Sequence, residues 1–358
     1  MRVLIWSDSY IPLLGGGELF TLRTKQALDA AGFDTHLATV KNNRIRAACD
    51  VTTIPILRIK GVPLASPYSL QSLIARFQPH GALLIGPSIN NVIVAALLGD
   101  RPIVTHYLGD LGWNSIAGRI LWPAYFRWYL PRSRYVLTIS DRVRESLIAQ
   151  GVPASRVSST KVGSDVPMVP DLELERENKI VFIGGLGRSH EYKRPDLLLR
   201  ALPILSDKDV SVALIGGGDA GWLRALVQEL SIEHRVRFLG VVDDEERARQ
   251  IRSARVLVLP SPTSQEGFGI VVLEAMRLGT PAVVGALAGA SELVAATGFG
   301  ETWRGTNEAD LARAIDLVLS MPHKSLQLAF EKFVAISNDY TWESVAARTV
   351  AVTSAAFA

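Results

Sequence analysis

The sequence predicts an α/β protein with two domains, each built around a doubly wound parallel sheet. The chain has 358 residues, whereas a single hydrophobic core stops growing at about 250–300 residues. In both halves, short apolar runs of strand length alternate with longer stretches of helical periodicity, which is typical of parallel sheets covered by helices. Hydrophobic residues make up 48% of the chain, enough for two cores.

Short apolar runs locate the strands of both sheets. In the first half we expect strands at residues 3–6, 33–40, 82–85, 103–106, 135–139 and 156–160. In the second half we expect them at residues 180–183, 210–215, 236–239, 256–259 and 281–284. Residues 171–179 are charged and lack apolar periodicity, which indicates a linker between a first domain at 1–170 and a second domain at 180–338.

Composition restricts the partners and the compartment. The net charge of +3 is too small to indicate a nucleic-acid partner, although it suits an anionic ligand or an anionic membrane face. Cys49 is the only cysteine, so no internal disulfide forms and a reducing compartment is favoured. No apolar run fits a signal peptide or spans a bilayer. We expect a cytoplasmic protein, with the inner face of the membrane as the alternative location; the oligomeric state is left open.

The stretch from Ser261 to Pro281 organises the second half. The apolar run 256–259 precedes a polar loop that contains Glu266, and Gly267-Phe268-Gly269 forms a turn. A helix is expected from Ile270 to Leu278, because Gly279 and Pro281 follow it as stop signals. This helix is apolar nearly all round, which predicts burial, yet Glu274 stands in its middle.

A carboxylate on a buried helix needs hydrogen-bond donors, because an unpaired buried charge is costly. No basic side chain lies within one turn on the face of Glu274, and sugar hydroxyls would be suitable donors. Glu266 is expected in the loop that faces the helix N-terminus, where the N–H groups of residues 269–271 would bind an anion. A phosphate with a hydroxylated group on each side describes a nucleotide-sugar. The alternative is an ordinary strand-turn-helix, with Glu266 solvated and Glu274 paired elsewhere.

The string EGFGIVVLEAM, with Glu266 and Glu274 separated by seven residues, resembles the E-x7-E signature of retaining glycosyltransferases of family 4. The resemblance covers nearly the whole chain. It implies the GT-B fold, in which two Rossmann-like domains face each other across a cleft and the second domain binds most of the donor. It also implies that a last helix, at 339–358, crosses back to the first domain and is anchored by Trp342. By the same resemblance, Glu266 contacts the donor sugar and Glu274 the nucleotide ribose.

The loop after the first strand of the second half resembles the family's diphosphate-binding loop. Residues 184–196 read GGLGRSHEYKRPD, similar to the G-x-L-(D)-R-x-H-x-x-K-G pattern, and Arg188 and Lys193 match the basic positions that hold the donor diphosphate. Two positions depart from the pattern: Gly187 replaces an acidic residue and Arg194 replaces a glycine. Fixed cations would stabilise the charge of a leaving diphosphate.

Further residues complete the predicted donor site. The segment 216–219 resembles the family's G-x-G turn, so Gly217 would let the backbone pass close to the nucleotide. Val242 follows a segment whose backbone meets the base in the family. The turn residues Gly267, Phe268, Gly269 and Ile270 are assigned to the donor with the two glutamates. These backbone roles do not identify the base, so UDP, GDP and ADP donors stay open, as do the sugar, the acceptor and the linkage position.

The first half contributes a glycine loop and two polar candidates. Pro12 and the glycines after it resemble the family's P-x-x-G-G loop, and Gly16 and Gly17 would let N–H groups approach the donor or the acceptor. The G-x-G-x-x-G spacing of a dinucleotide site is absent. His106 and Asp110 follow a strand where the family often has T-x-H-x-D; the spacing differs here, so both are candidate catalytic residues and either could contact the acceptor.

The segment from Trp113 to Arg134 interleaves six aromatic residues with arginines. Two interpretations stay open. An aromatic and basic amphipathic segment is typical of a helix that lies on an anionic membrane, which would suit a lipid-linked acceptor. An ordinary helix would instead bury the aromatic side chains in the core and leave the arginines solvated.

The resemblance predicts a retaining hexosyltransferase that moves sugar from a nucleoside-diphosphate sugar to an acceptor hydroxyl of a glycan, a lipid-linked molecule or a small molecule. No cofactor is implied, and no metal, because no D-x-D pair lies in a suitable loop. The sequence offers no second carboxylate as a covalent nucleophile, which favours attack on the front face with help from the leaving phosphate. Two alternatives remain: a non-catalytic subunit that binds nucleotide-sugars, or a nucleotide-sugar epimerase of the same fold.

Overall fold

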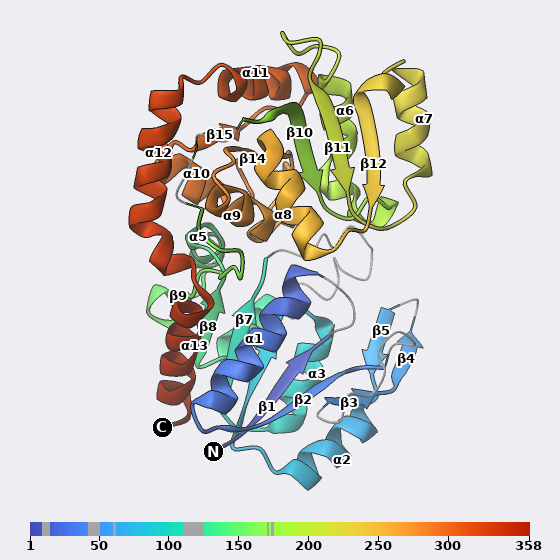
Figure 1. Ribbon diagram of the computed structural model, residues 1–358. Coiled ribbons are helices and arrows are strands. Elements are labelled where there is room, and N and C mark those ends of the chain that lie inside the picture. The colour runs from blue at the N-terminus through green and yellow to red at the C-terminus, as the bar shows by residue number, and fades with distance from the viewer. Residues whose placement is uncertain (9–14, 42–50, 60–61, 110–124, 170–171, 173–174) are drawn as a thin grey trace. The chain divides into compact units, whose positions relative to one another are not determined.

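The computed structural model contains two compact units (Figure 1). It describes residues 1–8, 15–41, 51–59, 62–109, 125–169, 172 and 175–358. The first unit comprises residues 1–163 together with 342–358, and the second comprises residues 164–341.

The first unit is built on a seven-stranded parallel sheet with the strand order β3-β2-β1-β6-β7-β8-β9. The strands are β1 (Arg2–Ser7), β2 (Asp34–Val40), β3 (Val51–Ile54), β6 (Gly81–Ile85), β7 (Ile103–Tyr107), β8 (Tyr135–Thr138) and β9 (Val157–Ser159). An antiparallel hairpin is formed by β4 (Ile56–Ile59) and β5 (Val62–Ala65). The helices include α1 (Gly16–Ala30), α2 (Pro67–Phe77), α3 (Ile89–Leu98), α5 (Asp141–Ala149) and α13 (Trp342–Phe357). Neither β3 nor the hairpin was expected from the apolar runs.

The local sequence explains why these elements form where they do. Residues 3–6 of β1 are wholly buried, as a strand covered by helices on both faces must be. Three helices begin after a serine whose side-chain oxygen accepts a hydrogen bond from a backbone N–H of the first turn: Ser66 for α2, Ser88 for α3 and Ser140 for α5.

The second unit is built on a six-stranded parallel sheet with the order β12-β11-β10-β13-β14-β15. The strands are β10 (Glu177–Ile183), β11 (Ser211–Ile215), β12 (Val236–Gly240), β13 (Ala254–Leu259), β14 (Ala282–Gly285) and β15 (Gly300–Trp303). The helices are α6 (Pro195–Ala201), α7 (Gly221–Glu229), α8 (Asp244–Ser253), α9 (Ile270–Arg277), α10 (Ser291–Thr297), α11 (Glu308–Leu319) and α12 (His323–Ile336). The strand β10 begins inside the segment expected as a linker, and β15 was not expected.

The strand order of the second unit reverses beside β10, which pairs with β11 on one side and β13 on the other. In doubly wound sheets, ligands bind outside the carboxyl ends of the strands at such a reversal. The loops that follow β10, β11 and β13 carry most of the predicted donor-site residues. The expected architecture of two parallel-sheet α/β domains is confirmed.

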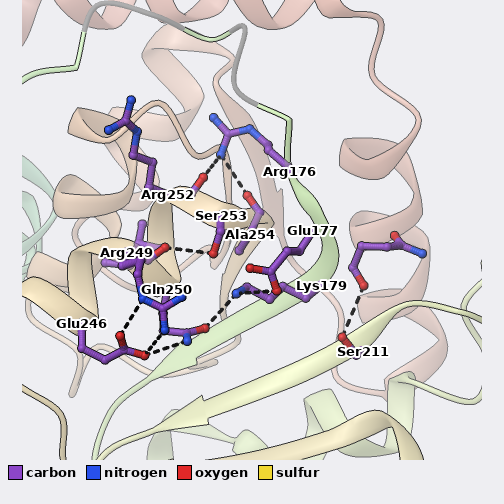
Figure 2. Close-up of polar contacts among 12 residues, drawn as sticks. Arg176, Glu177, Lys179, Ser211, Glu246, Arg249, Gln250, Arg252, Ser253 and Ala254 are labelled. Carbon is purple, nitrogen blue, oxygen red and sulfur yellow. Dashed lines mark hydrogen bonds and ion pairs between the residues drawn. The ribbon is translucent and has the colours of Figure 1, made fainter.

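Polar contacts fix α8 to the start of β10 (Figure 2). The buried ammonium of Lys179 donates to Gln250 Oε1 at 2.8 Å and lies 3.1 Å from a Glu177 carboxylate oxygen. The amide of Gln250 donates in turn to Glu246. A buried ammonium needs hydrogen-bond acceptors, and Lys179 finds one on α8 and one on β10. These contacts therefore hold α8 in one position on the strand.

The helix α13 packs against α1 within the first unit. The Trp342 side chain is 8% exposed, and its ring centroid lies 6.0 Å from that of Phe20. A Cβ added to Gly163 would lie 2.5 Å from the Trp342 backbone nitrogen, so the chain passes this point in close contact.

We expect Trp342→Ala to destabilise the first unit by about 3 kcal/mol, because truncating a buried tryptophan removes apolar burial and leaves a cavity. Urea unfolding followed by circular dichroism measures this. The matched control is Tyr68→Ala, since Tyr68 is 83% exposed in the same unit and surface substitutions stay within about 0.5 kcal/mol. Equal losses in both variants would contradict the anchoring role of Trp342.

Candidate functional site

Two glycine loops meet at the carboxyl ends of β10 and β11. The N–H of Leu186 donates to the Gly217 carbonyl at 2.8 Å. A Cβ on Gly216 would lie 1.8 Å from the Gly184 carbonyl oxygen, and one on Gly218 would lie 2.6 Å from the Gly187 nitrogen. Both glycines also have positive φ angles, so side chains are excluded there. The predicted residue Gly217 lies between them. A Cβ added to Gly217 would lie 3.1 Å from a Val241 methyl group.

The predicted residues Lys193 and Glu266 form an ion pair. Lys193 ends a short 3₁₀ turn after β10, and Glu266 lies in the loop after β13. Their side chains are only 14% and 11% exposed. Burial acts to lower the pKa of Lys193, but the Glu266 carboxylate and Tyr192 outweigh it, and the pKa is raised above its ordinary value. The lysine is therefore a cation whose charge is offset by a neighbouring carboxylate.

Arg188 is held by Trp222, a residue that the sequence analysis did not single out. The guanidinium carbon lies 4.3 Å from the indole centroid, and the indole N–H donates to the Leu186 carbonyl at 2.8 Å. Arg188 also pairs with Glu191 at 3.2 Å. These contacts are separate from the pair formed by Lys193 and Glu266. A cation stacked on an anchored aromatic ring is oriented before any ligand arrives.

The turn before α9 is fixed from both sides. Gly269 has a φ of +92°, and a Cβ there would lie 2.7 Å from a Leu259 methyl group. Phe268 is 2% exposed, and its carbonyl accepts a hydrogen bond from the Ala290 N–H at 2.8 Å. Because the N-cap of α9 is a glycine, the N-cap residue has no side chain to cap the first N–H groups of the helix. Ile270, the first helical residue, is partly exposed.

Glu274 is buried in the middle of α9, and its two carboxylate oxygens differ. Arg247 of α8 reaches Oε1 at 3.3 Å. The other oxygen, Oε2, is buried and has no hydrogen-bond partner among the described residues. Burial raises the pKa of Glu274 to about 6, although Arg247 acts to lower it. Oε1 is thus paired with an arginine from another helix, as the alternative interpretation expected. Oε2 has no partner among the described residues, and its contact with a sugar hydroxyl stays a prediction.

Sequence reasoning missed Arg247 because the charged start of α8 gives no sign of which arginine turns inward. Asp243 caps α8, and three acidic residues follow it in the first turn. Only the docking of α8 on β10 directs Arg247 toward α9. The predicted base contact, Val242, lies partly exposed in the loop just before this cap.

In the first unit, Gly16 and Gly17 form the first turn of α1, whose N-cap is also a glycine without a capping side chain. His106 lies in the core: it is wholly buried, and its Nε2 shares a hydrogen bond of 3.0 Å with the Thr160 hydroxyl. Its ring packs edge-on against Phe20 at 4.3 Å. Burial lowers the pKa of His106 to about 3, so the ring is neutral. Its Nδ1 is buried and has no hydrogen-bond partner among the described residues, and the catalytic role of His106 stays a prediction.

Three further predictions fall wholly or partly outside the described residues. Asp110 lies outside them, as do Pro12 of the glycine loop and the part of the aromatic segment from 113 to 124. The described remainder begins with a π-helical turn, Tyr125–Tyr129, in which both tyrosines are buried while Trp128 is 42% exposed. Within the described ranges, no helix is both long and apolar enough to cross a membrane.

Comparisons with known proteins show the family to which this chain belongs. Residues 170–332 match the family model described as glycosyl transferases group 1, and residues 14–161 match the model described as glycosyltransferase family 4. The chain is 32% identical over 283 residues to a phosphatidyl-myo-inositol mannosyltransferase of Propionibacterium freudenreichii subsp. shermanii, covering 75% of this chain and 67% of that protein. It is 32% identical over 202 residues to a D-inositol 3-phosphate glycosyltransferase of Frankia alni, covering 53% and 48%.

The chain therefore spans about half to two thirds of the length of these curated relatives. Among solved structures, Anabaena HepE in complex with UDP and glucose superposes with a TM-score of 0.76 at 18% identity, over 99% of this chain and 100% of that one. At this identity the likeness concerns the fold alone.

We expect Glu274→Gln to stabilise the ligand-free protein at pH 7.5 by about 2 kcal/mol, because an amide does not carry a buried negative charge. The raised pKa means that the folded state binds the proton more tightly. Stability of the parent protein should therefore fall as pH rises from 4.5, the ordinary value, to about 6 and then level off. Thermal unfolding across this range measures the effect. The exposed Glu229→Gln is the control, and a matching gain there would contradict the assignment.

Proposed function

Because this chain belongs to glycosyltransferase family 4 and has the GT-B fold, we propose that it transfers a hexosyl group from a nucleoside-diphosphate sugar to an acceptor hydroxyl, with retention at the anomeric carbon and without a metal ion. The buried Oε2 of Glu274, which has no hydrogen-bond partner within the described ranges, carries this proposal. It is an acceptor that needs a donor, on a helix whose uncapped N-terminus suits a phosphate.

The nucleotide ribose is the proposed partner of Glu274. Vicinal hydroxyl groups donate hydrogen bonds without carrying charge, so they satisfy a buried carboxylate oxygen without adding a further desolvated ion. Arg247 holds the other oxygen and so fixes the orientation of the carboxylate. Hydrogen bonds to an ionised acceptor are about twice as strong as neutral ones, so this contact contributes substantially to donor affinity.

The diphosphate is the proposed partner of Lys193, Arg188 and the N-terminus of α9. A lysine ammonium has three donors, so Lys193 can keep its bond to Glu266 while it donates to a phosphate oxygen. The phosphate oxygen would accept a hydrogen bond from a donor of the ammonium that Glu266 does not use. Arg188, stacked on Trp222, offers its planar fork to the same group.

In the proposed reaction, the bond between the anomeric carbon and the β-phosphate oxygen breaks, and the acceptor oxygen bonds to the anomeric carbon on the same face. The acceptor proton passes to the leaving phosphate oxygen, and the electron pair of the broken bond stays on that phosphate. Lys193 and Arg188 stabilise the charge that develops there. Glu266 is tied to a lysine, which makes it a poor nucleophile, and this supports front-face attack over a covalent intermediate.

The acceptor is proposed to be a hydroxyl of a polyol or glycan. Two observations support this: the family membership, and the names of the two curated relatives, both of which refer to inositol.

We expect one class among UDP-, GDP- and ADP-hexoses to raise the melting temperature of the protein. A ligand at 100 times its dissociation constant adds about 2.7 kcal/mol. Lys193→Ala and Glu274→Gln should each abolish most of this gain, while the exposed Lys208→Ala should keep it. EDTA should change nothing. A gain that EDTA removes would contradict metal independence, and no gain with any donor would contradict the donor assignment.

We expect the product to keep the anomeric configuration of the donor. Incubation of the bound donor with inositols and short glycans, followed by proton NMR of the product's anomeric coupling constant, reads the configuration directly. An α-linked donor should give an α-linked product. A β-linked product, or a glycosyl adduct on any side chain, would contradict the front-face mechanism.

A further inference from the structure

Apart from the candidate site of the second unit, the first unit has a polar site of its own, at the amino ends of its strands. A hollow of about 470 Å³ opens beside the residues that lead into β7, β8 and β9. Because the three strands are parallel neighbours, their amino ends share one edge of the sheet. Ligands of doubly wound sheets bind at the other edge, so this hollow is separate from any substrate site there.

Four arginines line the hollow: Arg101, Arg132, Arg134 and Arg156. Each is oriented by one hydrogen bond to a backbone carbonyl. These bonds run from Arg101 to Leu98 at 3.0 Å, from Arg132 to Gly99 at 2.6 Å, from Arg134 to Ala356 at 2.8 Å and from Arg156 to Pro131 at 3.2 Å. A guanidinium has five N–H donors, so each of the four keeps several for another partner.

The charges of these arginines are not balanced by neighbouring acids. Asp100 is the only acidic residue in the lining, and none of the four arginines forms an ion pair with a carboxylate in the described part of the chain. The carboxyl ends of α3 and α13 contribute partial negative charges of about one half each. Four positive charges against one carboxylate and two helix ends leave a net positive hollow.

Helix capping explains part of the cluster but not its convergence. Arg101 and Arg132 bond to the carboxyl end of α3, and Arg134 bonds to that of α13, as cations at helix ends often do. Arg156 caps none of the α-helices, since its partner is the carbonyl of Pro131 in the short 3₁₀ turn Leu130–Arg132. Capping uses one donor of each arginine and gives no reason for all four to face one hollow, where their mutual repulsion is unfavourable.

We propose that this arginine hollow binds a phosphate-bearing ligand, either a soluble phosphate ester or the headgroup of an anionic lipid. Arginine forks match the geometry of phosphate oxygens, and several forks around one hollow select a group with several acceptor oxygens. Trp128 is 42% exposed, and its ring centroid lies 5.1 Å from the guanidinium carbon of Arg132. An exposed tryptophan beside such a site fits the interfacial region of a membrane as well as the apolar part of a soluble ester.

Two binding assays with matched variants test the proposal. Calorimetry with inorganic pyrophosphate and with inositol phosphates tests the soluble source. Co-sedimentation with vesicles of phosphatidylcholine, with and without phosphatidylinositol, tests the lipid source. The test variant carries Arg132→Gln and Arg156→Gln. The control carries Lys25→Gln and Arg76→Gln, which removes the same charge elsewhere in the first unit.

We expect the parent and control proteins to bind one of these probes, and the test variant to bind it at least about tenfold more weakly, since two charge-assisted contacts are lost. Lys193→Ala should leave this binding unchanged, which separates the hollow from the donor site. Binding to inositol phosphate or pyrophosphate identifies a soluble source, and binding to phosphatidylinositol vesicles alone identifies a lipid source. Equal weakening in the test and control variants, or no binding of any probe, overturns the proposal.

If the double variant does not fold, Arg156→Gln alone replaces it, because that arginine contacts a short 3₁₀ turn and caps none of the α-helices. We expect a loss of about threefold or more for this single change. An unchanged affinity in a folded Arg156→Gln protein, together with unchanged salt dependence, would overturn the proposal in the same way.

Discussion

A carboxylate on a buried helix must find hydrogen-bond donors, and the second unit is arranged around this requirement at Glu274. One oxygen receives Arg247 from α8, and α8 is itself held on β10 by the buried contact between Lys179 and Gln250 (Figure 2). The other oxygen is left without a partner in the described structure. Half-satisfied polar groups are destabilising, so the folded protein retains an unfavourable contact that a bound ribose would remove.

The pair of Lys193 and Glu266 meets the corresponding requirement for a buried cation, which needs a negative partner. A cation needed for a phosphate would be costly to bury alone, because desolvation disfavours the charged form. Glu266 keeps the buried lysine charged, and its own charge is compensated in return. The geometry depends on Gly269, which adopts the positive φ of the turn between the Glu266 loop and α9 and has no Cβ that would meet Leu259. The conformation of Gly269 thus helps to determine where the Glu266 carboxylate lies.

The parts of this structure that follow from local pattern could be predicted, and the parts that follow from distant packing could not. Alternating apolar runs and stop signals located most strands, the turn and α9, because burial and turn chemistry act over a few residues. The burial of His106 depends on Phe20 and on Thr160, a residue 54 positions away. The partner of Glu274, Arg247, likewise comes from another helix. The strand β15 lies at the edge of its sheet, where it pairs with β14. No local pattern encodes such contacts.

The two sites of this protein use their cations differently, and the difference bears on selectivity. In the proposed donor site, Lys193 and Arg188 are already paired with carboxylates, so a bare phosphate would gain little there and would leave Glu274 unsatisfied. The proposed nucleotide-sugar donor would bring both phosphate oxygens and hydroxyl donors, and so would satisfy the cations and the buried oxygen together. In the arginine hollow, no carboxylate of the described residues pairs with the guanidinium groups, and no orphaned acceptor lines it. Such a site recognises phosphate itself, whatever group carries it.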